Sequence, residues 1–118
     1  MKNQPLIEKL KNAIRGIAFT YKSEFNFRLH SLSAVVVIIV LIIFQPIWIW
    51  WALIIICIAL VIAAELINTA IENLIDHLHP EIHPKIGKVK DIMAGMVLVL
   101  SLTAIIIALF AVLDTLGL

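Results

Sequence analysis

Long uncharged stretches alternate with short charged ones along the chain. No Asp, Glu, Lys or Arg occurs from 29 to 64, and another such stretch covers 92–113. One membrane crossing needs about 20 residues, so the first stretch is long enough for two. Gln45-Pro46 divides it, because proline disrupts a helix and restricts the residue before it. The pattern therefore predicts three membrane-spanning helices, over about 28–44, 47–64 and 92–113, the second continuing past the membrane to about 79.

The first 25 residues have a different periodicity. Apolar side chains recur at helical spacing while most polar ones lie elsewhere around the helix: Leu6, Ile7, Leu10, Ile14, Ile17, Ala18, Tyr21 and Phe25. This spacing predicts an amphipathic helix over about 5–25, lying on the membrane surface. The polar region is too long for a secretory signal. We expect residues 1–118 to form a single all-α integral membrane domain.

The basic residues are distributed asymmetrically about the predicted spans. Six lie before residue 29 and three in the connector between the second and third spans, whereas the 45–46 turn and the C-terminus have none. Because basic residues favour the cytoplasmic side, we expect the N-terminus and this connector inside and the C-terminus outside. Trp48, Trp50 and Trp51 beside the outer turn fit an interfacial aromatic belt.

Composition agrees with a membrane protein. The 118 residues are 63% hydrophobic with a mean hydropathy of +1.10, whereas soluble domains are about 45–50% apolar. A chain this small has too little interior to bury so many apolar side chains. The net charge of +1 argues against a nucleic-acid partner. The lone Cys57, within an apolar run, is interpreted as a small packed hydrophobe.

An acidic stripe begins where the second predicted span ends. On a helix, Glu65, Asn68, Glu72 and Asp76 fall within about 80° of one another. Carboxylates at the edge of a span are costly to desolvate, and this stripe contains no Lys or Arg. A divalent cation is a candidate partner, because hard cations prefer oxygen ligands. The structural alternative is the solvated face of a helix that extends beyond the membrane.

Other polar side chains are expected on the same side of the membrane: Glu24, His77, His79, Glu81, His83, Lys85, Lys88, Lys90 and Asp91. Carboxylates beside lysines indicate phosphate chemistry, in which the acids hold Mg²⁺ and a lysine offsets phosphate charge. Glu65, nearest the apolar run, is placed to act as a base toward a lipid hydroxyl. Glu72, about two turns further along, is better placed for a water-borne metal nucleotide.

Familiar nucleotide-binding motifs are absent from the sequence. Ile82 stands where a Walker A motif ending at Gly87-Lys88 needs its first glycine, and Val89 replaces its Ser or Thr. The histidines around Pro80 and Pro84 match no strong zinc spacing. Two other functions stay open, a non-catalytic helical membrane subunit with an acidic docking face and an ion- or metal-conducting oligomer. The spans contain few polar residues, which disfavours the second.

Four short segments resemble the small bacterial membrane lipid kinases, diacylglycerol kinase and its Gram-positive relative undecaprenol kinase. They are Ser23-Glu24 with Phe27-Arg28, the block 64–73, Glu81-Ile82-His83 and Lys90-Asp91. The Glu-x-x-Asn-x-x-x-Glu block followed by Lys-Asp is specific, and the spacing needs no gap from Glu24 to Asp91.

The resemblance implies ATP-dependent phosphorylation of a lipid hydroxyl, by a homotrimer of the bacterial inner membrane with active sites between subunits. It implies Glu65 as the general base and Glu24 and Glu72 as the Mg²⁺ ligands. The implied ATP contacts are Asn12, Glu24, Glu72, Asp76, Glu81, His83, Lys90 and Asp91, and the implied lipid contacts are Asn68, Asn26, Phe27, Arg28 and Ala94. Ala94, where diacylglycerol kinases commonly have Ser, favours undecaprenol as the acceptor, and diacylglycerol is the alternative.

Overall fold

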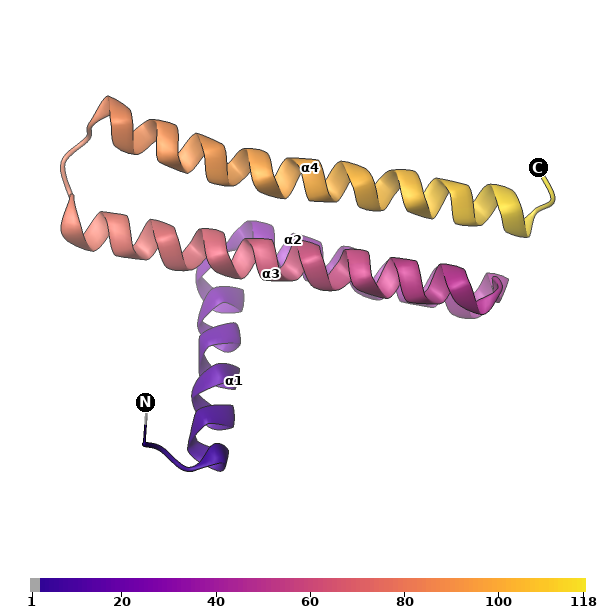
Figure 1. The fold of residues 1–118 in the computed structure, drawn as a ribbon, viewed down its shortest axis with the longest axis horizontal. Helices are drawn as coiled ribbons and strands as arrows, with labels where there is room; N and C mark the ends of the chain where they lie inside the picture. Colours follow the sequence, from indigo (N-terminus) through magenta and orange to yellow (C-terminus); the bar gives the residue numbers. More distant parts are fainter. Residues whose placement is uncertain (1–2) are drawn as a thin grey trace.

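The computed structural model describes residues 3–118, which form four helices joined by short connections. The helices are α1 (Leu6–Ser23), α2 (Phe25–Phe44), α3 (Trp48–Leu78) and α4 (Pro84–Thr115), and residues 3–118 contain no strand. Helices α2, α3 and α4 pack side by side, with α3 and α4 antiparallel, while α1 projects from them at a steep angle (Figure 1). The all-α architecture predicted from the sequence is confirmed.

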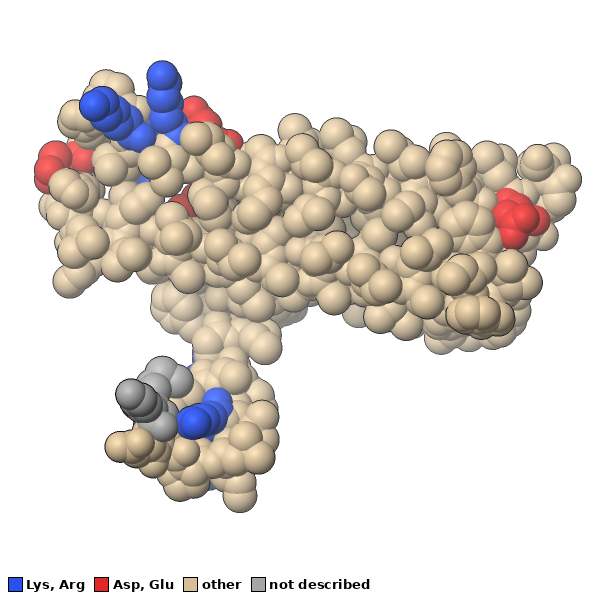
Figure 2. All heavy atoms as spheres, in the orientation of Figure 1, with Lys and Arg blue, Asp and Glu red and all other residues tan. Residues whose placement is uncertain are grey.

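Helices α2, α3 and α4 are each long and apolar enough to cross a membrane, as the uncharged stretches predict. On the face shown in Figure 2, most of the bundle is free of charged side chains, and Lys, Asp and Glu gather near the connection between α3 and α4. Many large apolar side chains are exposed, among them Val36, Ile56 and Ile106. Such a surface needs lipid or another protein to cover it.

The helices extend beyond the uncharged stretches. Helix α2 begins at Phe25, and α4 begins at Pro84, about two turns before residue 92. Proline suits the first turn of a helix, where its missing N–H would have no partner. The Nδ1 atom of His83 accepts a hydrogen bond of 3.1 Å from the amide of Lys85 and caps this helix. A charge pattern thus locates a span but not the ends of its helix.

A tight turn joins α2 to α3. Gln45 adopts the left-handed conformation with φ of 47°, and its amide donates a 2.8 Å hydrogen bond to the carbonyl of Leu41. Its side chain donates a second bond, of 2.8 Å, to the carbonyl of Ile42. Pro46 then prevents the helix from continuing. The turn therefore reverses the direction of the chain between Phe44 and Trp48, and α3 packs against α2.

Arg28 fixes the junction between α1 and α2. Its Nη1 donates to the carbonyls of Tyr21 and Lys22, at 2.7 and 2.9 Å. These carbonyls belong to the last turn of α1, where helix geometry leaves such groups without partners. The buried ring of Phe27 meets the ring of Tyr21 edge-on, with centroids 6.4 Å apart. These contacts hold α1 at its angle to α2.

Candidate active site

Glu65 is buried at the end of the uncharged part of α3. It is only 3% exposed, and its Oε1 lies 3.3 Å from Nε2 of His30 on α2. A buried carboxylate without a partner is costly, and the imidazole of His30 is a polar partner within reach of it. The packing of α2 against α3 therefore places His30 beside the buried Glu65 carboxylate.

Two further acids lie near Glu65. Glu24, between α1 and α2, and Glu72, on α3, are both close enough to Glu65 for like-charge repulsion. Glu72 lies about two turns beyond the uncharged stretch. Burial raises the pKa of the Glu72 carboxyl, and repulsion from Glu24 adds to the effect, while Lys90 opposes it. Helix α3 and the residue before α2 thus bring three carboxylates into one electrostatic cluster.

Lys90 pairs with the far end of the acidic stripe. Its Nζ donates a hydrogen bond of 2.8 Å to Oδ1 of Asp76, which joins α4 to α3. This hydrogen bond raises the pKa of Lys90. The stripe has no cation in its own helix, and the fold supplies one from the next helix.

Buried polar atoms without partners lie next to Glu65 on α3. Within residues 3–118, Oδ1 of Asn68 and Oγ1 of Thr69 are buried and accept or donate no hydrogen bond. An unsatisfied buried polar group costs about 1–3 kcal/mol. Asn68 is one turn from Glu65 on the same side of the helix, so its amide is available to a ligand that reaches the carboxylate.

The connection between α3 and α4 carries the remaining charged candidates. Glu81 is exposed, and its Oε1 lies 3.5 Å from Nδ1 of His79. A hydrogen bond from its own backbone amide, together with His79, lowers the pKa of Glu81. His83 caps α4, and Asp91 is exposed beside Lys90. These side chains lie at the same end of the bundle as the acidic stripe.

Several residues predicted to contact ATP or lipid form no hydrogen bond or ion pair with this acidic cluster among the described residues. Asn12 donates to Gln4 at 3.2 Å and accepts from Arg15 at 3.3 Å, all near or on α1. Asn26 and Ala94 are exposed. The contacts of Phe27 and Arg28 at the junction of α1 and α2 give these two residues a structural role.

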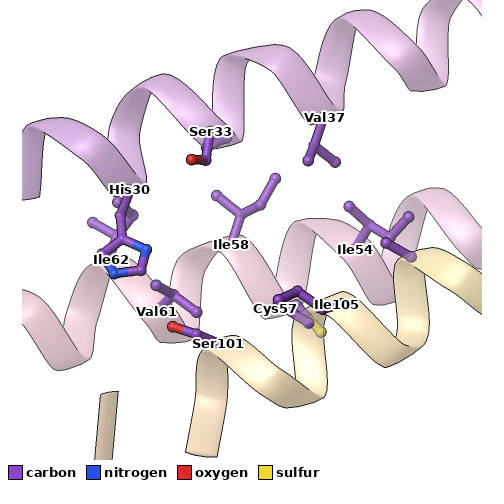
Figure 3. A pocket seen from close by; sticks show the side chains of 13 residues that line it. His30, Ser33, Val37, Ile54, Cys57, Ile58, Val61, Ile62, Ser101 and Ile105 are labelled. Carbon is purple, nitrogen blue, oxygen red and sulfur yellow. The ribbon is translucent and has the colours of Figure 1, made fainter. Parts of the chain in front are cut away.

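An apolar cavity of about 240 Å³ lies among α2, α3 and α4. Val37, Ile54 and Val61 are among the residues that line it, and His30 lies at one end (Figure 3). Ser33 and Ser101 are the other polar side chains of the lining. The cavity therefore begins at the histidine that contacts Glu65 and continues into the apolar part of the bundle.

The sequence alone did not single out His30. It lies inside a stretch defined by the absence of Asp, Glu, Lys and Arg, and its partner is 35 positions away on another helix. One signal was available, since an imidazole close to the start of a predicted span is a polar group that needs a partner. Spacing along one helix cannot identify that partner.

Comparison with known proteins identifies the family. Residues 11–112 match the family described as prokaryotic diacylglycerol kinase. The chain belongs to this family. Over 98 residues it is 35% identical to the undecaprenol kinase of Bacillus subtilis, covering 83% of this chain and 80% of that protein. Over 103 residues it is 29% identical to the diacylglycerol kinase of Synechocystis, covering 86% of this chain and 59% of that protein. No solved structure matches the chain significantly.

Membership of the prokaryotic diacylglycerol kinase family confirms the resemblance that the sequence indicates. It makes the chain a membrane-bound lipid kinase, and a kinase of this family implies a lipid acceptor and ATP as the phosphoryl donor. The two relatives are named for different acceptors, so their names leave the choice of lipid open.

Proposed function

We propose that this kinase transfers the γ-phosphate of MgATP to the hydroxyl of undecaprenol at the cytoplasmic face of the bacterial inner membrane. Diacylglycerol is the alternative acceptor. The observation that carries the proposal is Glu65, a buried carboxylate at the end of an uncharged span, joined through His30 to an apolar cavity. A lipid hydroxyl and a water-borne donor can meet at that depth.

Glu65 is the proposed general base. Its carboxylate takes the proton of the lipid hydroxyl while the hydroxyl oxygen bonds to the γ-phosphorus. The bond from that phosphorus to the β–γ bridging oxygen breaks, and ADP leaves with the electron pair. A positioned base contributes about 10²–10⁴-fold to such a rate. Placement of donor and acceptor supplies much of the rest.

Glu24 and Glu72 would hold Mg²⁺. The two carboxylates repel each other, and a divalent cation between them would relieve that repulsion. Within residues 3–118 no group of three or more His, Cys, Asp or Glu side chains is arranged to hold a metal. The proposed protein ligands are therefore these two carboxylates alone, and Mg²⁺ is usually bound by one or two carboxylates together with substrate phosphates and water. When bound, the ion would neutralise charge on the β- and γ-phosphates.

The nucleotide would lie beyond Glu65, toward the connection between α3 and α4. Lys90, held by Asp76, supplies positive charge for the phosphates. Helix α1 would lie on the inner membrane surface and cover the nucleotide. The remaining proposed ATP contacts are Asn12, Glu81, His83 and Asp91.

The lipid would enter from the side, with its hydroxyl toward Glu65 and part of its chain in the apolar cavity. Asn68, one turn from Glu65, would orient the hydroxyl by donating a side-chain N–H to its oxygen while Glu65 accepts its proton. Asn26, Phe27, Arg28 and Ala94 would lie along the lipid path. The exposed apolar flanks of α2 to α4 are compatible with a homotrimer whose sites lie between subunits.

The test is a phosphoryl-transfer assay on the purified protein in lipid nanodiscs. Radiolabelled ATP and Mg²⁺ are supplied with undecaprenol or diacylglycerol, and the labelled lipid is extracted and counted. We expect label in undecaprenol that depends on Mg²⁺. Faster labelling of diacylglycerol would reverse the choice of acceptor, and label in neither lipid would refute the proposed function.

A further inference from the structure

We infer that His30 is a positioning residue, whose imidazole holds the Glu65 carboxylate in the orientation that receives a lipid hydroxyl. The inference deepens the proposed function and rests on it. The two side chains come from different helices, His30 from α2 and Glu65 from α3, and their nearest atoms are 3.3 Å apart.

The need for a positioning group follows from burial. The Glu65 side chain is only 4% exposed, so water cannot be its main partner. A glutamate has three rotatable side-chain bonds, and an unrestrained carboxylate would spend little time in a reactive geometry. The Glu65 side chain therefore requires a neighbour that fixes it.

His30 is the neighbour with the right chemistry. The acids near Glu65, namely Glu24 and Glu72, repel its charge and cannot hold it. Among the ion pairs of residues 3–118, His30 is the only partner of Glu65. Contact is made at Oε1, which leaves Oε2 to accept the proton of the hydroxyl.

The position of His30 also links the base to the acceptor. His30 lines the apolar cavity among α2, α3 and α4, and it lies at the end of that cavity (Figure 3). Its side chain is 25% exposed, far more than that of Glu65. A lipid chain in the cavity would therefore bring its hydroxyl to Glu65 alongside this imidazole.

Two substitutions of His30 by polar side chains of different length test the inference. In His30→Gln the amide nitrogen stands as many bonds from Cα as Nε2 of histidine, whereas in His30→Asn it is one bond shorter. Each variant is assayed in nanodiscs for kcat and for the KM of MgATP and of the lipid. His77→Gln, at an exposed histidine of α3 outside the proposed site, is the matched control.

We expect His30→Asn to lower kcat at least about tenfold, since a displacement of about 1 Å can cost 10²-fold. The KM for MgATP should stay within about twofold, and His30→Gln should retain kcat within about threefold. A structural role alone would instead alter stability and both KM values together. MgATP binding by each variant checks that it is folded.

Equal kcat values for the Gln and Asn variants would overturn the inference, whether both are active or both are slow. If the parental protein is nevertheless active and Glu65→Gln abolishes that activity, the proposed function is still supported. A parental protein that phosphorylates neither lipid would refute the proposed function and this inference with it.

Discussion

Burial distinguishes Glu65 from the other acids of the α3 stripe. Glu65 is almost inaccessible, Glu72 is half-buried, and Asp76 is exposed and paired with Lys90. Accessibility thus increases along the helix as it leaves the uncharged stretch. The gradient suits a division of roles in which the buried acid meets the lipid and the more accessible one meets the metal nucleotide.

Glu65→Gln should lower turnover by about 10²-fold or more, because an amide cannot accept the proton of the lipid hydroxyl. MgATP binding should change little, since the proposed metal ligands are untouched. Single-turnover labelling measures the first quantity and calorimetric titration the second. Turnover at the parental rate would show that Glu65 is not the base.

Glu72→Gln should instead raise the Mg²⁺ concentration needed for half-maximal activity, by about tenfold. The loss of one carboxylate ligand should be partly overcome by saturating Mg²⁺. Titration of activity against Mg²⁺ at fixed ATP measures the shift. Glu8→Gln, at an exposed acid of α1, is the control, and a similar shift in both variants would count against a specific site.

At the scale of the helices, a side-chain hydrogen bond joins α3 to α4 near each end of the pair. Lys90 joins Asp76 at the charged end, and Nε1 of Trp50 donates a 2.8 Å hydrogen bond to Oδ2 of Asp114 at the other. Leu41, Ile54 and Ala111 form a small buried core next to the second of these hydrogen bonds. The paired ends keep two long helices in register.

Trp50→Phe and Asp114→Asn should each destabilise the protein by about 1 kcal/mol, the usual net value of a hydrogen bond. Turnover should stay within about twofold, because Trp50 lies about 22 Å along α3 from Glu65. Unfolding in detergent by a denaturant measures the first effect. Additive losses in the double variant would show that the two side chains are not coupled.

The uncharged stretches predict the spans well because lipid imposes a direct requirement on composition. The contacts of His30 with Glu65 and of Trp50 with Asp114 depend on how each helix is rotated against its neighbour. Hydropathy carries no such information, so neither pair was predictable. Likewise, the start of α4 at Pro84 follows from local capping by His83 rather than from apolar content.

At the scale of the whole molecule, charge within the bundle of α2, α3 and α4 is concentrated at one end, while α1 carries further basic side chains (Figure 2). Lys, Asp and Glu cluster near the connection between α3 and α4, and the opposite end carries only acidic atoms in this view (Figure 2). Asp114 is the acid of that opposite end. The proposed orientation rests on the basic residues alone, which lie before the first span and in the connection between α3 and α4 and therefore favour the cytoplasm.

Cysteine labelling in intact cells tests the orientation. In a Cys57→Ser background, a membrane-impermeant maleimide should label Leu118→Cys from outside, and should label Ile82→Cys only after permeabilisation. Both positions are highly exposed, so accessibility within the protein does not limit the reaction. Labelling of Ile82→Cys in intact cells would reverse the proposed orientation.

Helix α3 is one unbroken piece of 31 residues, about 46 Å long, whereas the hydrocarbon core of a bilayer is about 30 Å thick. Glu65 and Glu72 are therefore fixed to the same rigid rod. One residue inserted between them would move Glu72 about 1.5 Å further from Glu65 along the helix axis and rotate it by about 100° about that axis. We therefore expect activity to depend on bilayer thickness. A thicker membrane would place Glu65 deeper than the lipid hydroxyls, and a thinner one would place it outside their depth.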